Sequence, residues 1–259
     1  MLLVEPIPAF EDNYIWLLQE ADGQGAAVVD PGDSEPVIER LRADGTALRA
    51  ILITHHHGDH TGGIRDLLGE WPDAVVSAPA DRRIRGATRT VGEGDRVSMP
   101  GLAARFDVIE VPGHTSTHIA YLGADMLFCG DTLFAAGCGR VFDGTFAHLA
   151  ASLRRIAALP PQTLCYCAHE YTMANLGFAA WVEPHSQALA ERTAAARALR
   201  ERGLPTVPSL LSLELATNPF LRTAEPDVIA AAETFGGAGL PDETAVFTAL
   251  RQWKDACYD

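Results

Sequence analysis

The chain of 259 residues is poor in cysteine and lysine, and it contains no long apolar run. Its five cysteines form no CxxC pair, and the count is odd. This usage predicts reduced thiols in a cytoplasmic protein and argues against a disulfide framework. No apolar stretch approaches the roughly 20 residues that a membrane-spanning helix needs. The sequence therefore predicts a protein without a membrane partner.

The N-terminus and the charge balance exclude further classes of protein. The opening "MLLVEPIPAF" lacks a basic region and meets Glu and Pro after four residues, so we predict no signal peptide. A net charge of −14 argues against nucleic acid as a partner, because a phosphate backbone requires clustered basic residues. A hydrophobic content of 47% is typical of a folded globular protein, which we expect to be a monomer.

The first 170 residues predict short strands separated by turns, with two helices between them. The helices are expected at 34–45, with Ser34 as the N-cap, and at 145–159 before Pro160. The pattern indicates a sheet-rich α/β core with helices on its faces. The expected strands lie at 25–30, 47–54, 73–78, 96–99, 104–111, 118–122, 125–130 and 162–169.

The amino-acid composition and the spacing of apolar residues change after residue 170. The stretch 183–203 is rich in Ala, Arg and Glu with helical spacing, and two later segments begin with Pro-Asp and continue with an apolar stripe. We therefore predict two domains, a catalytic domain over 1–170 and a helical substrate-binding domain over 171–259.

Histidine and aspartate gather where predicted strands end. The segment "THHHGDH" at 54–60 follows the apolar run "ILI", and three further residues follow other apolar runs in the same way. Loops held by a rigid sheet commonly carry binding sites, so one shared site at an edge of the sheet is expected. The candidate ligands are His55, His57, Asp59, His60, His114, Asp131 and His169.

The spacing within 54–60 suggests how the ligands divide. Side chains alternate in an extended segment, so His55 and His57 can reach one metal ion while His56 points away. Asp59 and His60 follow the break at Gly58 and can face a second ion. Imidazole and carboxylate without thiolate suit borderline divalent ions. Two such ions can activate a water molecule and polarise a carbonyl group, which is hydrolytic chemistry.

The other histidines receive ordinary interpretations. His118 lies four residues after His114 and is expected to support the site by a hydrogen bond or by packing. His148 and His185 lie in segments that we expect to be helical and to have no role in the site. A histidine-rich surface tag is rejected, because the motif is bounded by an apolar strand and by a glycine turn.

These motifs resemble the metallo-β-lactamase superfamily. "THHHGDH", "GHTSTH", "CGD" and "CAHEYT" reproduce its ligand positions in order over residues 25–170. The resemblance implies an αββα sandwich with a dinuclear site at one edge. It implies that one ion binds His55, His57 and His114. The second ion would bind Asp59, His60 and His169, and Asp131 would bridge the two.

A closer resemblance is to the glyoxalase II (hydroxyacylglutathione hydrolase) family. It rests on "FEDNYIW" (10–16), "AGCGRVFDGT" (136–145), "AHEYT" (168–172), "TNPFLR" (217–222) and "RQWKD" (251–255), and it covers nearly the whole chain, including the added helical domain. It implies hydrolysis of S-D-lactoylglutathione to D-lactate and glutathione. Zinc is the expected ion, and iron and manganese are compatible with the same ligands.

The same resemblance implies a set of glutathione contacts. A chain of net charge −14 needs local cations to hold a ligand with two carboxylates, and Lys254 is its single lysine. The chain departs from the family by having Arg140 and Phe142 where relatives carry Lys and Tyr, and Thr117 in place of a glycine. The implied contacts are Arg140, Phe142, Tyr171, Arg251 and Lys254.

The resemblance also implies a mechanism and defines its rivals. The attacking hydroxide would be oriented by Asp59, and a thiol of pKa near 8.5 would leave without a dedicated acid. A lactonase or general thioesterase is the nearest alternative, and "RQWKD" and "TNPFLR" argue against it. A persulfide dioxygenase would need only part of the ligand set. A flavo-diiron electron-transfer protein would replace histidines by carboxylates and add a flavin domain.

Overall fold

A computed structural model describes residues 2–20 and 25–258, and the chain divides into two compact units. Unit 1 comprises Met1–Glu110 with Thr117–Gly130, and unit 2 comprises Val111–Ser116 with Asp131–Asp259. Unit 2 therefore includes residues 131–170 as well as the C-terminal helices. These units are not the two predicted domains, and a domain boundary at residue 170 stays a prediction.

Unit 1 contains a six-stranded mixed sheet in the order β1-β2-β3-β4-β5-β6. Strands β1, β2 and β3 pair antiparallel, and β3 to β6 pair parallel. The central strand β3 has the sequence "AAVV" and is buried throughout, as expected for a strand covered on both faces. The strands are Leu2–Ala9, Asn13–Glu20, Ala26–Val29, Leu48–Leu52, Val75–Ala78 and Arg89–Thr90.

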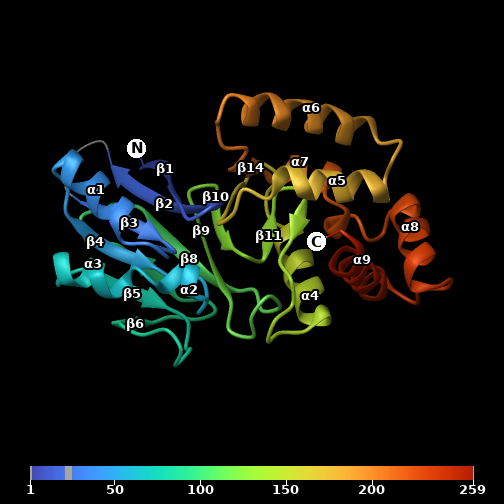
Figure 1. Cartoon of the computed structure of the whole chain (residues 1–259). Coiled ribbons are helices and arrows are strands. Elements are labelled where there is room, and N and C mark those ends of the chain that lie inside the picture. Colours follow the sequence, from blue (N-terminus) through green and yellow to red (C-terminus); the bar gives the residue numbers. More distant parts are fainter. Residues whose placement is uncertain (1, 21–24, 259) are drawn as a thin grey trace. The chain divides into compact units, whose positions relative to one another are not determined.

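Two helices cover one face of this sheet (Figure 1). Helices α1 (Glu35–Asp44) and α3 (Ile64–Glu70) contribute Val37 and Ile64 to the same apolar cluster as the strand residues Val28 and Ile51. The helix predicted at 34–45 is confirmed with Ser34 at its N-cap position, but the Ser34 side chain does not cap it. Ser34 already has helical dihedrals and makes no capping bond, and the Asp33 carboxylate accepts the Glu35 N–H at 3.0 Å instead.

The second sheet of unit 1 is antiparallel in the order β10-β9-β8-β7. The buried Tyr121 hydroxyl, on β9, donates to the carbonyl oxygens of Ile53 and Ser77 at 2.9 and 3.1 Å. It thereby ties this sheet to the end of β4 and to β5 in the first sheet. The strands are β7 (Arg96–Ser98), β8 (Arg105–Glu110), β9 (Ile119–Gly123) and β10 (Met126–Gly130).

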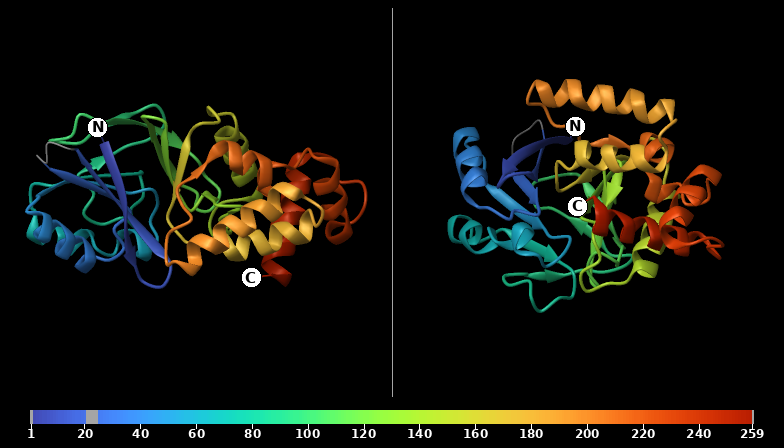
Figure 2. Two further views of the ribbon diagram at one scale, coloured as in Figure 1. Left: turned by 90° about the horizontal axis from the view of Figure 1, so that it is seen from above. Right: turned by 45° about the vertical axis from the view of Figure 1, so that its right-hand side comes forward.

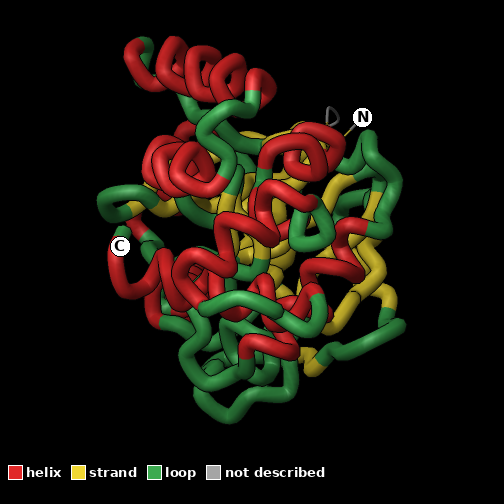
Figure 3. Tube along the Cα trace, turned by 90° about the vertical axis from the view of Figure 1, so that its right-hand side faces the viewer, coloured by secondary structure: helices red, strands yellow, loops and turns green. Residues whose placement is uncertain are grey.

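Unit 2 is mostly helical (Figures 2 and 3), which confirms the predicted helical C-terminal region. It also contains the hairpin β11–β12 and the antiparallel pair β13–β14. Residues Cys165, Tyr166 and Cys167 are buried in β13, which confirms the strand predicted at 162–169. Its strands are β11 (Leu133–Phe134), β12 (Gly137–Cys138), β13 (Leu164–Cys167) and β14 (Ser209–Leu210).

The helices of unit 2 begin with α4, which confirms the helix predicted at 145–159. The Thr145 hydroxyl caps it by accepting the His148 N–H at 3.1 Å. His148 lies in α4 as expected, whereas His185 lies in a turn before α6 and not in a helix. The helices are α4 (Phe146–Ala157), α5 (Thr172–Val182), α6 (Gln187–Glu201), α7 (Leu211–Thr217), η1 (Pro219–Leu221), α8 (Pro226–Gly236) and α9 (Glu243–Cys257).

Each candidate ligand follows a strand, as predicted. The ligands at 55–60 come after β4, and His114, Asp131 and His169 follow β8, β10 and β13.

Among residues 2–20 and 25–258, no helix is both long enough and apolar enough to cross a bilayer.

Candidate functional site

In unit 1, a relay of hydrogen bonds sets the orientation of His55. The Thr54 hydroxyl donates to the Asp30 carboxylate at 2.7 Å, so its oxygen can accept the proton of His55 Nδ1 at 3.0 Å. This arrangement leaves the lone pair of His55 on Nε2. All three side chains are buried, and Asp30 also accepts the Thr54 N–H at 2.8 Å. Asp30 therefore fixes the tautomer of His55 through Thr54.

His55 and His57 direct ring nitrogens at the same point. His55 Nε2 lies 3.0 Å from His57 Nδ1. Two imidazole nitrogens bound at 2.0–2.1 Å to one tetrahedral ion would be roughly 3.3 Å apart. The observed separation is therefore close to that of two ligands of a single cation.

His60 and Asp59 lie on the short helix α2 (Gly58–Thr61), which begins at the Gly58 break. The buried His60 has Nδ1 3.0 Å from the Asp30 carboxylate and Nε2 3.4 Å from that of Asp59. The Asn13 amide donates to the Asp59 carboxylate at 3.1 Å. The two ring nitrogens of His60 thus face different carboxylates, Nδ1 that of Asp30 and Nε2 that of Asp59.

The donor set of unit 1 fits a divalent cation. Ligand atoms of Asp30, His55 and His60 lie within 4.8 Å of one another. The imidazoles have carboxylate or hydroxyl partners on Nδ1, which is the usual arrangement around metal-binding histidines. The chemistry of the donors, with no thiolate among them, suits zinc, iron or manganese.

His56 and His118 have different surroundings from the candidate ligands. His56 Nδ1 lies 3.5 Å from Asp81, and among the described residues His56 belongs to none of the groups of side chains that could hold a metal ion, in agreement with its predicted exclusion from the ligand set. The Arg83 side chain holds the pKa of Asp81 well below its usual 3.8. Thr117, the departure from the motif noted in the sequence, donates to Asp81 at 2.7 Å, so the loop accommodates this side chain.

His118 is buried and stacks on His55 with ring centroids 4.6 Å apart. Packing against a candidate ligand agrees with the supporting role predicted for it.

In unit 2, the Asp131 carboxylate lies between two histidines. One of its oxygens is 3.5 Å from His114 Nε2, and the other is 3.4 Å from His169 Nε2. His114 Nδ1 lies 2.8 Å from the Arg140 carbonyl oxygen, which can only accept, so Nε2 carries the lone pair. His169 stacks on Tyr171 at 4.7 Å. A carboxylate with each oxygen beside a different imidazole suits the predicted bridging role.

The predicted substrate contacts of unit 2 differ in exposure. The Arg140 and Phe142 side chains are 52% and 64% exposed, and the Phe142 ring lies edge-on to His114 at 5.2 Å. The Phe142 N–H donates to the His114 carbonyl at 3.0 Å, so this residue also fixes the ligand loop through its backbone. These two residues can meet a ligand from solution.

Arg251 and Lys254 lie on α9 and are 0% and 6% exposed. The Arg251 guanidinium donates to the Cys138 carbonyl at 3.0 Å and to Asp255 at 2.9 Å. Its bonds therefore hold β12 in this structure, and direct contact with a substrate stays a prediction for both residues.

Sequence reasoning did not find Asp30 or Asn13 as part of the site. Asp30 has a φ of 52° in the left-handed region, which is uncommon for a residue other than glycine, and it ends β3 before Pro31. A strand end followed by "PG" was visible in the sequence, but the partners of Asp30 are 24 to 30 residues away. Only the parallel pairing of β3 with β4 brings them together.

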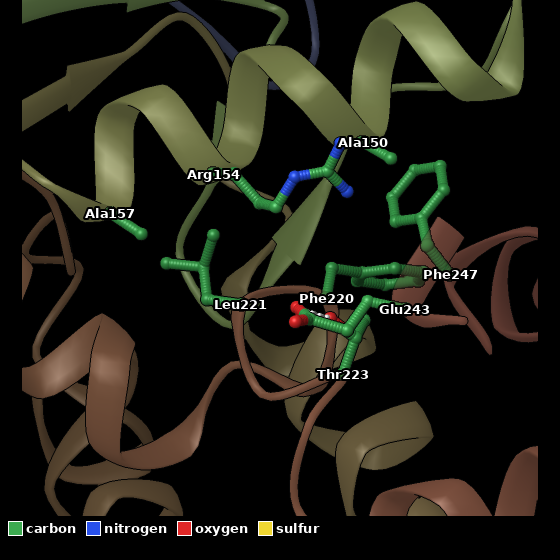
Figure 4. A pocket seen from close by; sticks show the side chains of 8 residues that line it. All are labelled: Ala150, Arg154, Ala157, Phe220, Leu221, Thr223, Glu243 and Phe247. Atoms are coloured by element: carbon green, nitrogen blue, oxygen red, sulfur yellow. Dashed lines mark hydrogen bonds between the residues drawn. The ribbon is translucent and has the colours of Figure 1, made fainter. Parts of the chain in front are cut away.

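Unit 1 has a hollow beside the candidate ligand Asp59, and unit 2 has a small cavity that no candidate ligand lines. In unit 1, an open hollow of about 430 Å³ is lined by Phe10, Glu11, Asp12, Asn13 and Asp59, and it gives Asp59 access to solvent. In unit 2, a cavity of about 30 Å³ is lined by residues of α4, α9 and the η1 segment, including Arg154 and Glu243 (Figure 4). It holds only one or two waters and is too small for an organic substrate.

Comparison with protein families gives two matches that together span the chain. The model of the metallo-beta-lactamase superfamily matches residues 9–169. The model described as hydroxyacylglutathione hydrolase C-terminus matches residues 170–257.

Individual proteins are similar over nearly the full length. A hydroxyacylglutathione hydrolase of Methylobacillus flagellatus is 51% identical over 98% of this chain and 99% of its own. A hydroxyacylglutathione hydrolase of Cupriavidus metallidurans is also 51% identical, over 98% of this chain and 99% of its own.

A solved structure, the B3 metallo-beta-lactamase BLEG-1, aligns with a TM-score of 0.62 and 22% identity over 85% of this chain and 99% of that chain. At this identity the likeness shows the fold alone. It confirms the predicted metallo-β-lactamase-type architecture, and the ligand set of such a fold supports divalent metal ions.

Proposed function

Because the chain belongs to the hydroxyacylglutathione hydrolase family of the metallo-β-lactamase superfamily, we propose that it hydrolyses S-D-lactoylglutathione to D-lactate and glutathione. Related S-2-hydroxyacylglutathiones belong to the same substrate class. The observation that carries the proposal is the match at 51% identity over 98% of the chain, which includes the C-terminal region. A superfamily match over residues 9–169 alone would leave the substrate open.

The proposed metal centre holds two divalent ions. His55, His57 and His114 would bind one ion, Asp59, His60 and His169 the other, and Asp131 would take part in both. The geometry within each unit supports this division, because His55 and His57 converge and the two oxygens of Asp131 face different histidines. We propose zinc as the ion, with iron and manganese as chemically acceptable substitutes.

When bound, such ions supply a water of pKa near 7 and polarise the thioester carbonyl. The protein's own contribution begins with Asp59, whose carboxylate would accept a hydrogen bond from the attacking water and orient it. The Asn13 amide holds that carboxylate in place at 3.1 Å. The glutathione thiol needs no dedicated acid, since its pKa near 8.5 allows it to leave as the thiolate.

Substrate binding requires local positive charge. Glutathione carries two carboxylates, and the chain has a net charge of −14. Arg140, half exposed, can bind a carboxylate with a bidentate fork, and Lys254 offers a point charge. Phe142 would contribute apolar contact, because its ring cannot donate a hydrogen bond. Tyr171 and Arg251 complete the proposed set.

A substrate series tests the function. Purified protein loaded with zinc, iron or manganese would be assayed for thiol release from S-D-lactoylglutathione. The same acyl group on N-acetylcysteamine, which lacks both carboxylates, would be assayed in parallel, together with a lactone. We expect the highest kcat/KM on the glutathione thioester. Faster lactone hydrolysis, or equal rates on both thioesters, would contradict the proposal, and metal analysis should find two ions per chain.

We also propose that the protein acts as a cytoplasmic monomer. All five cysteines are free thiols, and four of them are buried. Burial raises the pKa of Cys138 to about 11 and that of Cys167 to about 12, so these thiols stay protonated and unreactive near neutral pH. Light scattering coupled to size-exclusion chromatography tests the monomer, and a mass near twice 27.7 kDa would contradict it.

A further inference from the structure

The hairpin β11–β12 in unit 2 contacts or adjoins all three candidate ligands of that unit. It begins two residues after Asp131 and ends two residues before Arg140, whose carbonyl oxygen orients His114. Its residue Phe134 packs edge-on against His169 with centroids 5.8 Å apart. The position of this hairpin therefore controls the position of the ligand atoms.

The hairpin is too short to hold its own shape. Its ladder pairs only Leu133 with Cys138 and Phe134 with Gly137, and its turn residue Ala136 has a φ of 56°. A left-handed conformation is unfavourable for alanine, because its Cβ crowds the backbone. An isolated two-stranded hairpin is at best marginally stable in water. Something outside the hairpin must stabilise it.

Side chains from three helical segments of unit 2 provide that support. The buried Glu214 carboxylate accepts the Ala136 N–H at 2.9 Å. The buried Asn218 amide donates to the carbonyl oxygens of Phe134 and Gly137 at 3.3 and 2.9 Å. The amide of Asn175 donates to the Ala135 carbonyl at 3.0 Å. All four residues from Phe134 to Gly137 thus have a backbone atom held by a side chain.

Glu214 is the centre of this network. Besides the Ala136 N–H, its carboxylate accepts hydrogen bonds from Asn218 at 3.1 Å and Ser209 at 2.6 Å, and it pairs with the buried Arg192. Arg192 donates in addition to Thr217 at 2.6 Å, so the "TN" of "TNPFLR" belongs to the same network. A carboxylate with this many donors has a single orientation, and a buried polar network of this kind rigidifies its surroundings.

We propose that Glu214, with Asn218, is a positioning residue that holds the β11–β12 hairpin so that Asp131, His114 and His169 are preorganised for metal binding. This inference rests on the proposed ligand roles. It assigns a function to the "TNPFLR" segment, which the substrate contacts leave without one. Among the described residues, the hydrogen bonds of Glu214 go to Ala136, Arg192, Ser209 and Asn218 and not to a candidate ligand, so it acts through the hairpin backbone.

The test compares two glutamates of unit 2 that both pair with arginine. In Glu214→Gln, the amide cannot satisfy Arg192, Ser209, Asn218 and the Ala136 N–H together, because its NH₂ group donates where a carboxylate oxygen accepted. Glu183→Gln is the matched control, since the mostly buried Glu183 pairs with Arg222 at 2.9 Å. That pair lies on α5 and the η1 end and bonds no hairpin atom among the described residues.

Three measurements without substrate are made on each purified variant: melting temperature, zinc affinity by chelator competition, and hydrogen exchange of amides 132–142. We expect both variants to melt earlier. Only Glu214→Gln should lose affinity, by about 10- to 100-fold, the usual effect of removing an outer partner of a metal site. Its amides at 132–142 should exchange faster, whereas those of α8 should not change.

Wild-type zinc affinity and wild-type exchange in Glu214→Gln would overturn the proposal, and so would an equal loss of affinity in Glu183→Gln. If Glu214→Gln does not fold, Asn218→Asp takes its place, because it keeps the cap on the Phe220 N–H and removes the donors to the hairpin. If neither folds, the network is a requirement of folding and the proposal fails. A wild-type protein that binds no zinc would instead refute the proposed metal centre.

Discussion

The two units present their candidate ligands in opposite ways. Unit 1 carries four of them in the six residues from His55 to His60, and unit 2 carries three that are spread over 56 residues, from His114 to His169. In unit 1 the support comes from a few single side chains, chiefly Asp30 at a strand end and Asn13 beside Asp59. In unit 2 it comes from a hairpin that a helical network holds. A contiguous ligand segment needs little support because the chain itself sets its spacing, whereas dispersed ligands depend on tertiary contacts.

The largest expected effect is the loss of a ligand in either unit. Asp131→Ala and His55→Ala should each reduce turnover by more than the roughly 100-fold that follows loss of an outer partner. Asp131→Ala should also lower the metal content below two ions per chain, because Asp131 is proposed to bind both ions. Metal analysis and initial rates measure this. Near-normal turnover in either variant at wild-type metal content would contradict the dinuclear mechanism.

A glycine in each unit offers a second comparison. A Cβ at Gly139 would lie 2.0 Å from the Asp131 carbonyl oxygen and 2.9 Å from His114 Nδ1, so Gly139→Ala must displace a ligand. A shift of about 1 Å can cost roughly 100-fold in rate. A Cβ at Gly58 would meet nothing within 4 Å, so Gly58→Ala should keep wild-type kcat/KM. Equal rates for the two variants would show that the unit 2 ligands tolerate displacement.

The third prediction concerns the support of unit 1. Asparagine tolerates the left-handed backbone at position 30, but its NH₂ group cannot accept from Thr54 or face His60 Nδ1–H. Asp30→Asn should therefore weaken zinc binding by about tenfold or more. The control is Asp33→Asn in the same turn, because Asp33 is half-buried and its carboxylate caps α1. Unchanged affinity in Asp30→Asn would mean that the contiguous segment is preorganised without Asp30.

The smallest expected effect is a change in the stability of unit 1 that leaves zinc binding unchanged. The depressed pKa of Asp81 means that its ionised form stabilises the fold above the ordinary pKa of 3.8, and this contribution is lost as the pH falls through the lower folded value. Asp81→Asn should lower Tm at pH 7 by about 2–4 °C per kcal/mol lost. The difference from wild type should shrink below pH 4, and zinc affinity should be unchanged. A Tm difference that does not vary with pH would contradict this account.

Much of the architecture was predictable because local patterns carry it. The eight predicted strands, the helix at α1 and the helical C-terminal region follow from apolar runs and turn residues, and the ligands follow strand ends as expected. The two N-terminal strands β1 and β2 were not predicted. The errors are also local in origin. Ser34 is the N-cap residue of α1 but its side chain makes no capping bond, and His185 falls in a turn despite its helical neighbours. The supporting roles of Asp30, Asn13 and Glu214 carry no local signal, because the groups that they support, His60, Asp59 and the Ala136 N–H, lie far away in the sequence.

The sequence by itself predicted which side chains can bind metal and that His55 and His57 face one point. This was possible because the alternation of an extended chain is a local property. Only the tertiary structure decided which nitrogen of each histidine carries the lone pair, since that depends on partners such as Thr54 for His55 and the Arg140 carbonyl for His114. It also placed Glu214 beneath the hairpin that follows Asp131. Those partners meet only when strands pair and helices pack, and no spacing along the chain encodes the distance between them.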